Sequence, residues 1–205
     1  MVSNVQAARR RLAPVERREE ILRAAERLIA KNGAAVRVED IVSAAGAAKG
    51  TFYLYFPSFD DLLEALRTRV FEAFDAGHPF SPPQTRDAWL HNLECLALAF
   101  VETVIDMRAL HGALFHSDFA ARRPVASEIH PVNRLAAIIR EGVAAGGFRK
   151  VNPLPTARLL FAAIHETADA VCDGASARAA KAALKDVLRS VLAPRDVTPA
   201  RGGKA

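Results

Sequence analysis

The chain contains few of the cysteines, glycines and prolines that are abundant in disulfide-rich or disordered proteins. Its 205 residues include only two cysteines, Cys95 and Cys172, which lie far apart and form no CxxC pair. This spacing excludes a disulfide framework and predicts free thiols in a reducing cytoplasm. Glycine and proline number 11 each, which is too few for extensive disorder away from the ends. We therefore expect a folded, cytoplasmic protein.

Long apolar runs and familiar catalytic motifs are also absent. No uninterrupted apolar run reaches the roughly 18 residues of a membrane span, so no membrane partner is expected. The basic start of the chain is followed by no apolar segment, and we expect no secretory signal. There is no P-loop, GxSxG, GxGxxG or paired Glu-x-x-His motif, and the sequence predicts no cofactor and no enzyme.

Helical periodicity dominates what is present. Hydrophobic residues make up 51% of the chain, and they recur at helical spacing without strand-like alternation or internal repeats. The pattern predicts an all-α fold of about nine helices. We expect a three-helix domain over residues 14–60, a larger helical domain over 61–194, and flexible ends at 1–13 and 195–205.

The segment 36–56 predicts a helix-turn-helix. Val38, Ile41, Val42 and Ala45 share one helical face, and Gly46 follows where a helix ends in the left-handed conformation. A second short helix must begin almost at once, near Lys49. Two short helices joined by a tight glycine turn form the motif whose second helix enters the major groove of DNA. The alternative is an αα-hairpin whose aromatic residues belong only to the core and have no role in DNA binding.

Charge favours the DNA interpretation. Residues 1–56 carry ten Lys or Arg against six Asp or Glu, whereas residues 57–205 carry eighteen against seventeen. Lys49 lies in a first helical turn, where the helix dipole disfavours a cation unless a polyanion is nearby. Tyrosine hydroxyls at positions 53 and 55 can donate to phosphate oxygens. The residues predicted to contact double-stranded DNA are Arg37, Lys49, Gly50, Thr51, Tyr53 and Tyr55.

These residues resemble the signature of the TetR family of bacterial transcriptional regulators. The resemblance covers about residues 15–75 and rests on five runs: Val38-Glu39-Asp40-Ile41, Ala45-Gly46, Lys49-Gly50-Thr51-Phe52-Tyr53, Tyr55-Phe56-Pro57 and Asp61-Leu62-Leu63. The chain departs from the family pattern at three positions. Arg37 replaces a common Ser or Thr, Ala48 replaces a common Ser, and Phe59 replaces a common Lys. These departures remove two helix caps and two phosphate contacts. The resemblance implies a homodimeric repressor that a small-molecule effector releases from a palindromic operator.

The resemblance also places effector binding and dimerisation in the C-terminal domain. Pockets for small molecules are mostly apolar, with few polar groups, so a largely apolar effector is expected. Its candidate contacts are Trp89, Phe100, Met107, His111, Phe115, Phe119, Phe161, His165 and Asp169. The alternative for the aromatic residues is ordinary core packing. The helix at 156–173 is apolar on several sides, which suits either a monomer core or a partner.

The resemblance favours packing of this helix against a partner chain, so that the last two helices of each chain form a four-helix interface. The dimerisation candidates are Leu160, Ile164, Leu184, Val187, Leu188 and Val191. His165, Asp169 and Cys172 share a helix face and have metal-ligating side chains, although we predict no metal site. An all-α enzyme or metal-responsive protein using His165 and Asp169, or a helical adaptor, stays open as an alternative.

Overall fold

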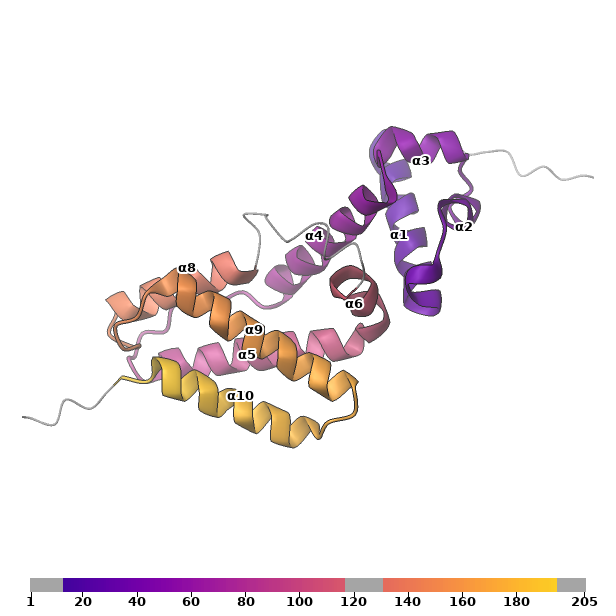
Figure 1. Cartoon of the computed structure of the whole chain (residues 1–205). Helices are drawn as coiled ribbons and strands as arrows, with labels where there is room; N and C mark the ends of the chain where they lie inside the picture. Colours follow the sequence, from indigo (N-terminus) through magenta and orange to yellow (C-terminus); the bar gives the residue numbers. More distant parts are fainter. Residues whose placement is uncertain (1–12, 117–130, 195–205) are drawn as a thin grey trace, which may run out of the picture. The chain divides into compact units, whose positions relative to one another are not determined.

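A computed structural model describes residues 13–116 and 131–194. Within these ranges the chain forms nine α-helices, one short 3-10 turn and no strand (Figure 1). The predicted all-α class with about nine helices is confirmed. The chain divides into two compact units, one made of Met1–Val70 with Met107–Ala126 and the other of Phe71–Asp106 with Ser127–Ala205. The predicted flexible ends, apart from Ala13, and Phe119 lie outside the described residues.

The first unit contains six helical segments. They are α1 (Pro14–Asn32), η1 (Gly33–Ala35), α2 (Val38–Ala44), α3 (Lys49–Tyr55), the first part of α4 (Phe59–Gly77), and α6 (Arg108–Phe115). Proline is well suited to the first position of a helix, where Pro14 opens α1. The Glu16 carboxylate accepts the free N–H of Ala13 at 3.1 Å. The helix ends at Gly33, whose φ of +65° favours glycine.

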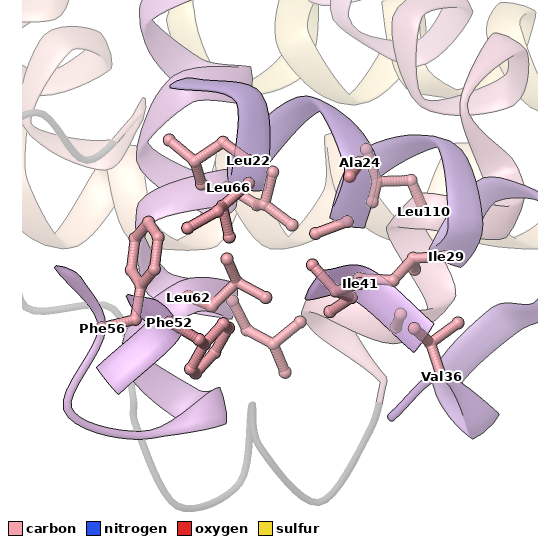
Figure 2. Packing of buried hydrophobic residues seen from close by; sticks show 14 of the residues in the cluster. Leu22, Ala24, Ile29, Val36, Ile41, Phe52, Phe56, Leu62, Leu66 and Leu110 are labelled. Carbon is pink, nitrogen blue, oxygen red and sulfur yellow. The ribbon is translucent and has the colours of Figure 1, made fainter. Parts of the chain in front are cut away.

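One hydrophobic cluster joins the helices of the first unit (Figure 2). Its fully buried members include Ile21 of α1, Ile41 of α2, Phe52 of α3 and Leu62 of α4. Leu114 of α6 is also fully buried there. A helix that the sequence placed among the C-terminal segments therefore completes the core of the first unit. The compact units accordingly differ from the predicted ranges 14–60 and 61–194.

The second unit packs four long helices and the end of α4. These helices are α5 (Ala88–Asp106), α8 (Pro131–Ala144), α9 (Pro153–Cys172) and α10 (Ala177–Leu192). Helix α9 contacts α5, α8 and α10, so it is the central element of this unit. The hydroxyl of Ser176 accepts the N–H of Ala179 at 3.4 Å and caps α10.

Helix α5 is apolar because its side chains form the core of the second unit. By length and composition alone it could cross a membrane, although the sequence has no uninterrupted apolar run of that length. Its Trp89, Leu93 and Phe100 side chains are buried in the protein. Its buried Glu94 accepts two hydrogen bonds from the Arg189 guanidinium of α10, at 2.8 and 3.1 Å. These contacts are those of a core helix in a folded domain.

Two glycines permit close aromatic packing at one end of the second unit. The rings of Trp89 and Phe148 meet edge to face, with centroids 5.8 Å apart. A Cβ on Gly147 would lie 2.3 Å from the indole ring, and a Cβ on Gly142 would lie 2.2 Å from the Phe148 ring. Neither position leaves room for a side chain. Trp89 is thus a packing residue of this aromatic cluster.

Candidate nucleic-acid interface and ligand pocket

Helices α2 and α3 form the predicted helix-turn-helix. At the end of α2, the N–H of Ala47 donates to the carbonyl of Val42 at 2.8 Å, and the N–H of Gly46 donates to that of Ser43 at 3.2 Å. Together with a φ of +60° at Gly46, these bonds form a Schellman turn. Neither helix has a side-chain acceptor at its N-cap, as the residues Arg37 and Ala48 predict. The Asp40 carboxylate accepts the backbone N–H of Arg37 instead, at 3.1 Å.

Two buried rings fix the orientation of α3. Phe52 and Phe56 are 0% and 1% exposed, and their ring centroids lie 5.6 Å apart. Figure 2 shows both rings among the core side chains of the first unit. The guanidinium of Arg18 lies over the Phe56 ring at 5.0 Å, which is a cation–π distance. Because one side of α3 is held in this way, its other side faces solvent.

The solvent-facing side of α3 carries Gly50, Tyr53 and Leu54. Tyr53 is 47% exposed and Leu54 is 81% exposed. Thr51 and Tyr55 are half-buried, and Tyr55 packs against the core of the first unit. Of the α3 residues predicted to contact DNA, Lys49, Gly50 and Tyr53 are therefore the more accessible. Leu54 was not among the predicted DNA contacts.

Among residues 13–116 and 131–194, no contact requires a glycine at position 50. An added Cβ would meet no atom within 4 Å, and its φ is not positive. Glycine is less favourable than alanine inside a helix by up to about 1 kcal/mol. Because Gly50 has no side chain, the backbone of a partner molecule can approach the exposed face of α3 closely at this position.

An ion pair joins α2 to α3 on this surface. The Lys49 ammonium lies 2.6 Å from a carboxylate oxygen of Glu39, and both side chains are more than half exposed. The hydrogen bond from Lys49 holds the pKa of Glu39 below its usual value. The same bond raises the pKa of Lys49, so both groups are charged at neutral pH. Arg37 is a further exposed cation, with its Nε 3.6 Å from the Asp40 carboxylate.

The second unit contains an apolar hollow of about 40 Å³ that opens to solvent. It is lined by the rings of Phe74, Phe100 and Phe161 and by aliphatic side chains of α5, α8 and α9. The centroids of Phe74 and Phe100 lie 5.2 Å apart, and those of Phe100 and Phe161 lie 5.5 Å apart. The lining includes one ion pair, in which Arg134 donates to the Asp75 carboxylate. This lining has the chemistry of a small-molecule site, and a ligand would have to widen the hollow in order to enter it.

Comparisons with known proteins agree with the helix-turn-helix geometry. Residues 21–66 match the sequence model of the family described as bacterial regulatory proteins, tetR family. Over these residues the chain carries a domain of the tetR family. Its matched range begins in α1, includes α2 and α3, and ends in the part of α4 that belongs to the first unit. No curated protein sequence matches the chain.

Solved structures of TetR-family regulators share the fold over most of this chain. One, described as a TetR-family transcriptional regulator from Rhodococcus sp., is 25% identical, with a TM-score of 0.68 over 87% of this chain and 100% of that one. Another TetR-family regulator, from Pectobacterium atrosepticum, is 22% identical with a TM-score of 0.68, over 91% of this chain and all of that one. RolR in complex with resorcinol is 21% identical with a TM-score of 0.68, over 87% and 88% of the two chains. The chain thus has a TetR-family regulator fold.

The predicted effector contacts fall in several places of this fold. Phe100 and Phe161 line the hollow, whereas Trp89 packs against Phe80 and Phe148. Met107 and Phe115 pack against the core of the first unit. His111 is buried in α6, 3.2 Å from the His116 ring nitrogen. Sequence periodicity identifies inward-facing aromatic residues but does not say which of them border a cavity.

His165 and Asp169 form a pair on α9, as their spacing predicts. The Nδ1 of His165 lies 3.0 Å from the Asp169 carboxylate, and both side chains are about one-fifth exposed. Neither residue lines the hollow, although the Phe161 ring lies one turn from the His165 ring at 6.1 Å. Their role in effector binding stays a prediction.

Four of the six predicted dimerisation residues are buried in the chain's own core. Leu160, Ile164, Leu184 and Leu188 are each at most 4% exposed. Val187 is 41% exposed, and Val191 is half-buried. The exposed large hydrophobic residues of α9 are Leu159, at 74%, and Leu154, at 41%, both of which the prediction left out. The sequence located an apolar helix pair correctly, but these four side chains face inward rather than outward.

Proposed function

We propose that this TetR-family chain is a homodimeric transcriptional repressor that binds a palindromic operator and is released by a small apolar effector. The observation that carries the proposal is the exposed face of α3. No described residue of the chain requires a glycine at position 50, Leu54 is exposed, and Lys49 supplies a cation at the edge. Insertion of α3 into the major groove of a DNA duplex accounts for all three features, because it brings phosphates close to Lys49 and base edges close to the helix.

Dimerisation is supported by an exposed stripe on α9 and α10. Leu159 and Ala162 are exposed on α9, one turn apart, and Ala183 and Val187 are exposed on α10 at the same helical spacing. Small alanine side chains let two helices approach closely, and flanking Leu and Val supply apolar area. We place the partner helices on this stripe instead of on the buried residues of the same helices. Two recognition helices then read two half-sites, which explains why a palindrome is needed.

Effector release is supported by the hollow and by the course of α4. Phe74 and Asp75 of α4 line the hollow, and Leu62, Leu63 and Leu66 of the same helix pack into the core of the first unit. A ligand that prefers one position of this helix shifts the population towards that conformation. Operator DNA must then weaken effector binding by the same factor. A change from mostly bound to mostly free DNA needs about 10⁴-fold differential affinity, or roughly 5.5 kcal/mol.

The release step is tested by a gel shift in the presence of small molecules. Full-length protein is bound to a duplex taken from upstream of its own gene, and a library of apolar aromatic compounds is screened for release. Phe161→Ala enlarges the hollow, and it should change which compounds release the duplex while leaving affinity without ligand nearly intact. If this variant binds DNA poorly with and without ligand, Phe161 serves the fold and the effector site lies elsewhere.

A further inference from the structure

Leu54 is an exposed leucine on the face of α3 that carries Gly50. Among the described residues of the first unit, the exposed large hydrophobic side chains are Val15, Tyr53 and Leu54, and Leu54 has the highest exposed fraction at 81%. Leu54 follows Gly50 by four positions, so the two residues lie one above the other on one side of the helix. The open space at Gly50 therefore lies directly next to the Leu54 side chain.

The fold does not use the Leu54 side chain. Phe52 and Phe56 supply the buried contacts of α3, and the backbone N–H of Phe56 closes the helix on the carbonyl of Phe52 at 2.9 Å. Single exposed leucines are common on protein surfaces and need no special explanation. This one, however, shares its helix face with a glycine that the fold does not require and with Tyr53, and it lies within one turn and a half of the Lys49 cation. An isobutyl side chain forms no hydrogen bond with phosphate or with a base edge, so its partner must be apolar.

The major groove offers one exposed apolar group, the C5-methyl of thymine. A helix whose face lacks a side chain at Gly50 can approach the base edges closely, and a branched aliphatic chain one turn later can then reach a methyl group. We propose that Leu54 is a specificity-determining residue that reads a thymine methyl in each half-site. This inference rests on the proposed DNA-binding function, and it assigns base discrimination to an apolar contact and not to the polar residues of α3.

The test separates the methyl group from every other property of the base. Wild-type, full-length protein first selects its preferred duplex from a random-sequence library. Each thymine of that duplex is then replaced singly by deoxyuridine, which removes the methyl and keeps the base pair. We expect one thymine per half-site at which the replacement weakens wild-type binding about fourfold, the ratio that corresponds to the ~0.8 kcal/mol of one buried methyl-sized group. Replacement in both half-sites should cost about fifteenfold.

Variants attribute the effect to Leu54. Leu54→Ala should bind the thymine and deoxyuridine duplexes equally well, with an unchanged unfolding midpoint because the side chain is exposed. Val15→Ala, an equivalent truncation of an exposed aliphatic residue on α1, should keep the wild-type sensitivity. If no deoxyuridine replacement matters to the wild type, or if Leu54→Ala keeps the same sensitivity, the assignment to Leu54 is overturned. Failure to select any preferred duplex would instead overturn the proposed DNA-binding function itself.

Discussion

Gly50 shows how a residue can be unfavourable for the fold and still be suited to function. Its backbone is helical and its Cβ position is open, so alanine fits there without strain. Gly50→Ala should raise the free energy of unfolding by up to about 1 kcal/mol, because it restricts the unfolded chain and favours the helix. The added methyl faces the proposed DNA surface, and we expect operator affinity to fall at least tenfold.

Gly112 provides a matched control for this prediction. It lies in α6, and a Cβ there would also meet nothing within 4 Å. Gly112→Ala should therefore stabilise the protein by a similar amount without changing DNA affinity. Thermal unfolding and a gel shift on the same samples measure both quantities. If Gly50→Ala binds DNA as well as Gly112→Ala does, α3 does not approach DNA through Gly50.

The Glu39–Lys49 pair makes a second prediction at the residue scale. Glu39 holds Lys49 through a 2.6 Å contact and adds a negative charge beside the proposed phosphate site. Glu39→Gln should therefore raise DNA affinity several-fold at low salt.

Lys49→Ala should lower affinity and flatten the slope of log K against log salt by about 0.9 for each phosphate that is no longer neutralised. Titrations at several salt concentrations check both variants, and an unchanged slope in Lys49→Ala would show that Lys49 contacts no phosphate.

The pH dependence of this pair has a defined sign. The pKa of Glu39 is lowered in the folded protein, so its stabilising contribution is present above the usual value of 4.5 and is lost as pH falls through the folded pKa. The stability difference between wild type and Glu39→Gln should be constant between about pH 6 and 8 and should vanish in acid. Both groups are exposed, so the difference is small. Chemical denaturation at a series of pH values measures it.

At the scale of elements, the segment after α8 makes a prediction about packing. Gly147 leaves no room for a Cβ, which would lie 2.3 Å from the Trp89 ring. Gly147→Ala should therefore destabilise the second unit by about 1–3 kcal/mol through overpacking. Trp89 is the only tryptophan, so its fluorescence reports the change directly. Gly77→Ala is the control, because its Cβ position is open, and equal unfolding midpoints for the two variants would contradict this packing.

Helix ends follow from the sequence where a nearby residue favours the start or the end of a helix. Pro14 and the Asn32-Gly33 pair bound α1, and Ser176 caps α10. Helix α8 likewise begins at a proline, Pro131. These signals are local, because a missing N–H, a positive φ or a capping hydroxyl acts within a few residues. Periodicity and local signals were thus sufficient for the all-α fold.

The functional surfaces were harder to predict because they depend on which apolar face has a neighbour. Motif spacing placed Lys49 and Gly50 on α3, but it gave no reason to select Leu54. On α9 the adjacent residues Leu159 and Leu160 have the same side chain, yet one is 74% exposed and the other 1%. Likewise, the packing of α6 in the first unit depends on contacts between segments far apart in the sequence. Such contacts leave no local signal.

At the scale of the whole molecule, the exposed stripe of α9 predicts how a dimer can be broken. Leu159→Glu should shift a dimer to monomers while leaving the unfolding midpoint nearly unchanged, because the residue is exposed in the single chain. Leu184→Glu should instead unfold the second unit, since it places a charge at a fully buried position. Sedimentation together with circular dichroism distinguishes the two results. A wild type that sediments as a monomer at micromolar concentration would contradict the dimer.

The central claim is that α3 reads DNA sequence as one half of a symmetric dimer. Selection of wild-type protein against a random library of duplexes, at about 0.15 M salt, tests it most directly. We expect enrichment of one palindromic sequence with two half-sites about one helical turn or a multiple apart, bound by two or more chains. Lys49→Ala and Gly50→Ala should enrich it poorly or not at all. Recovery of no common sequence by the wild type, or of the same palindrome equally well by both variants, would contradict the account.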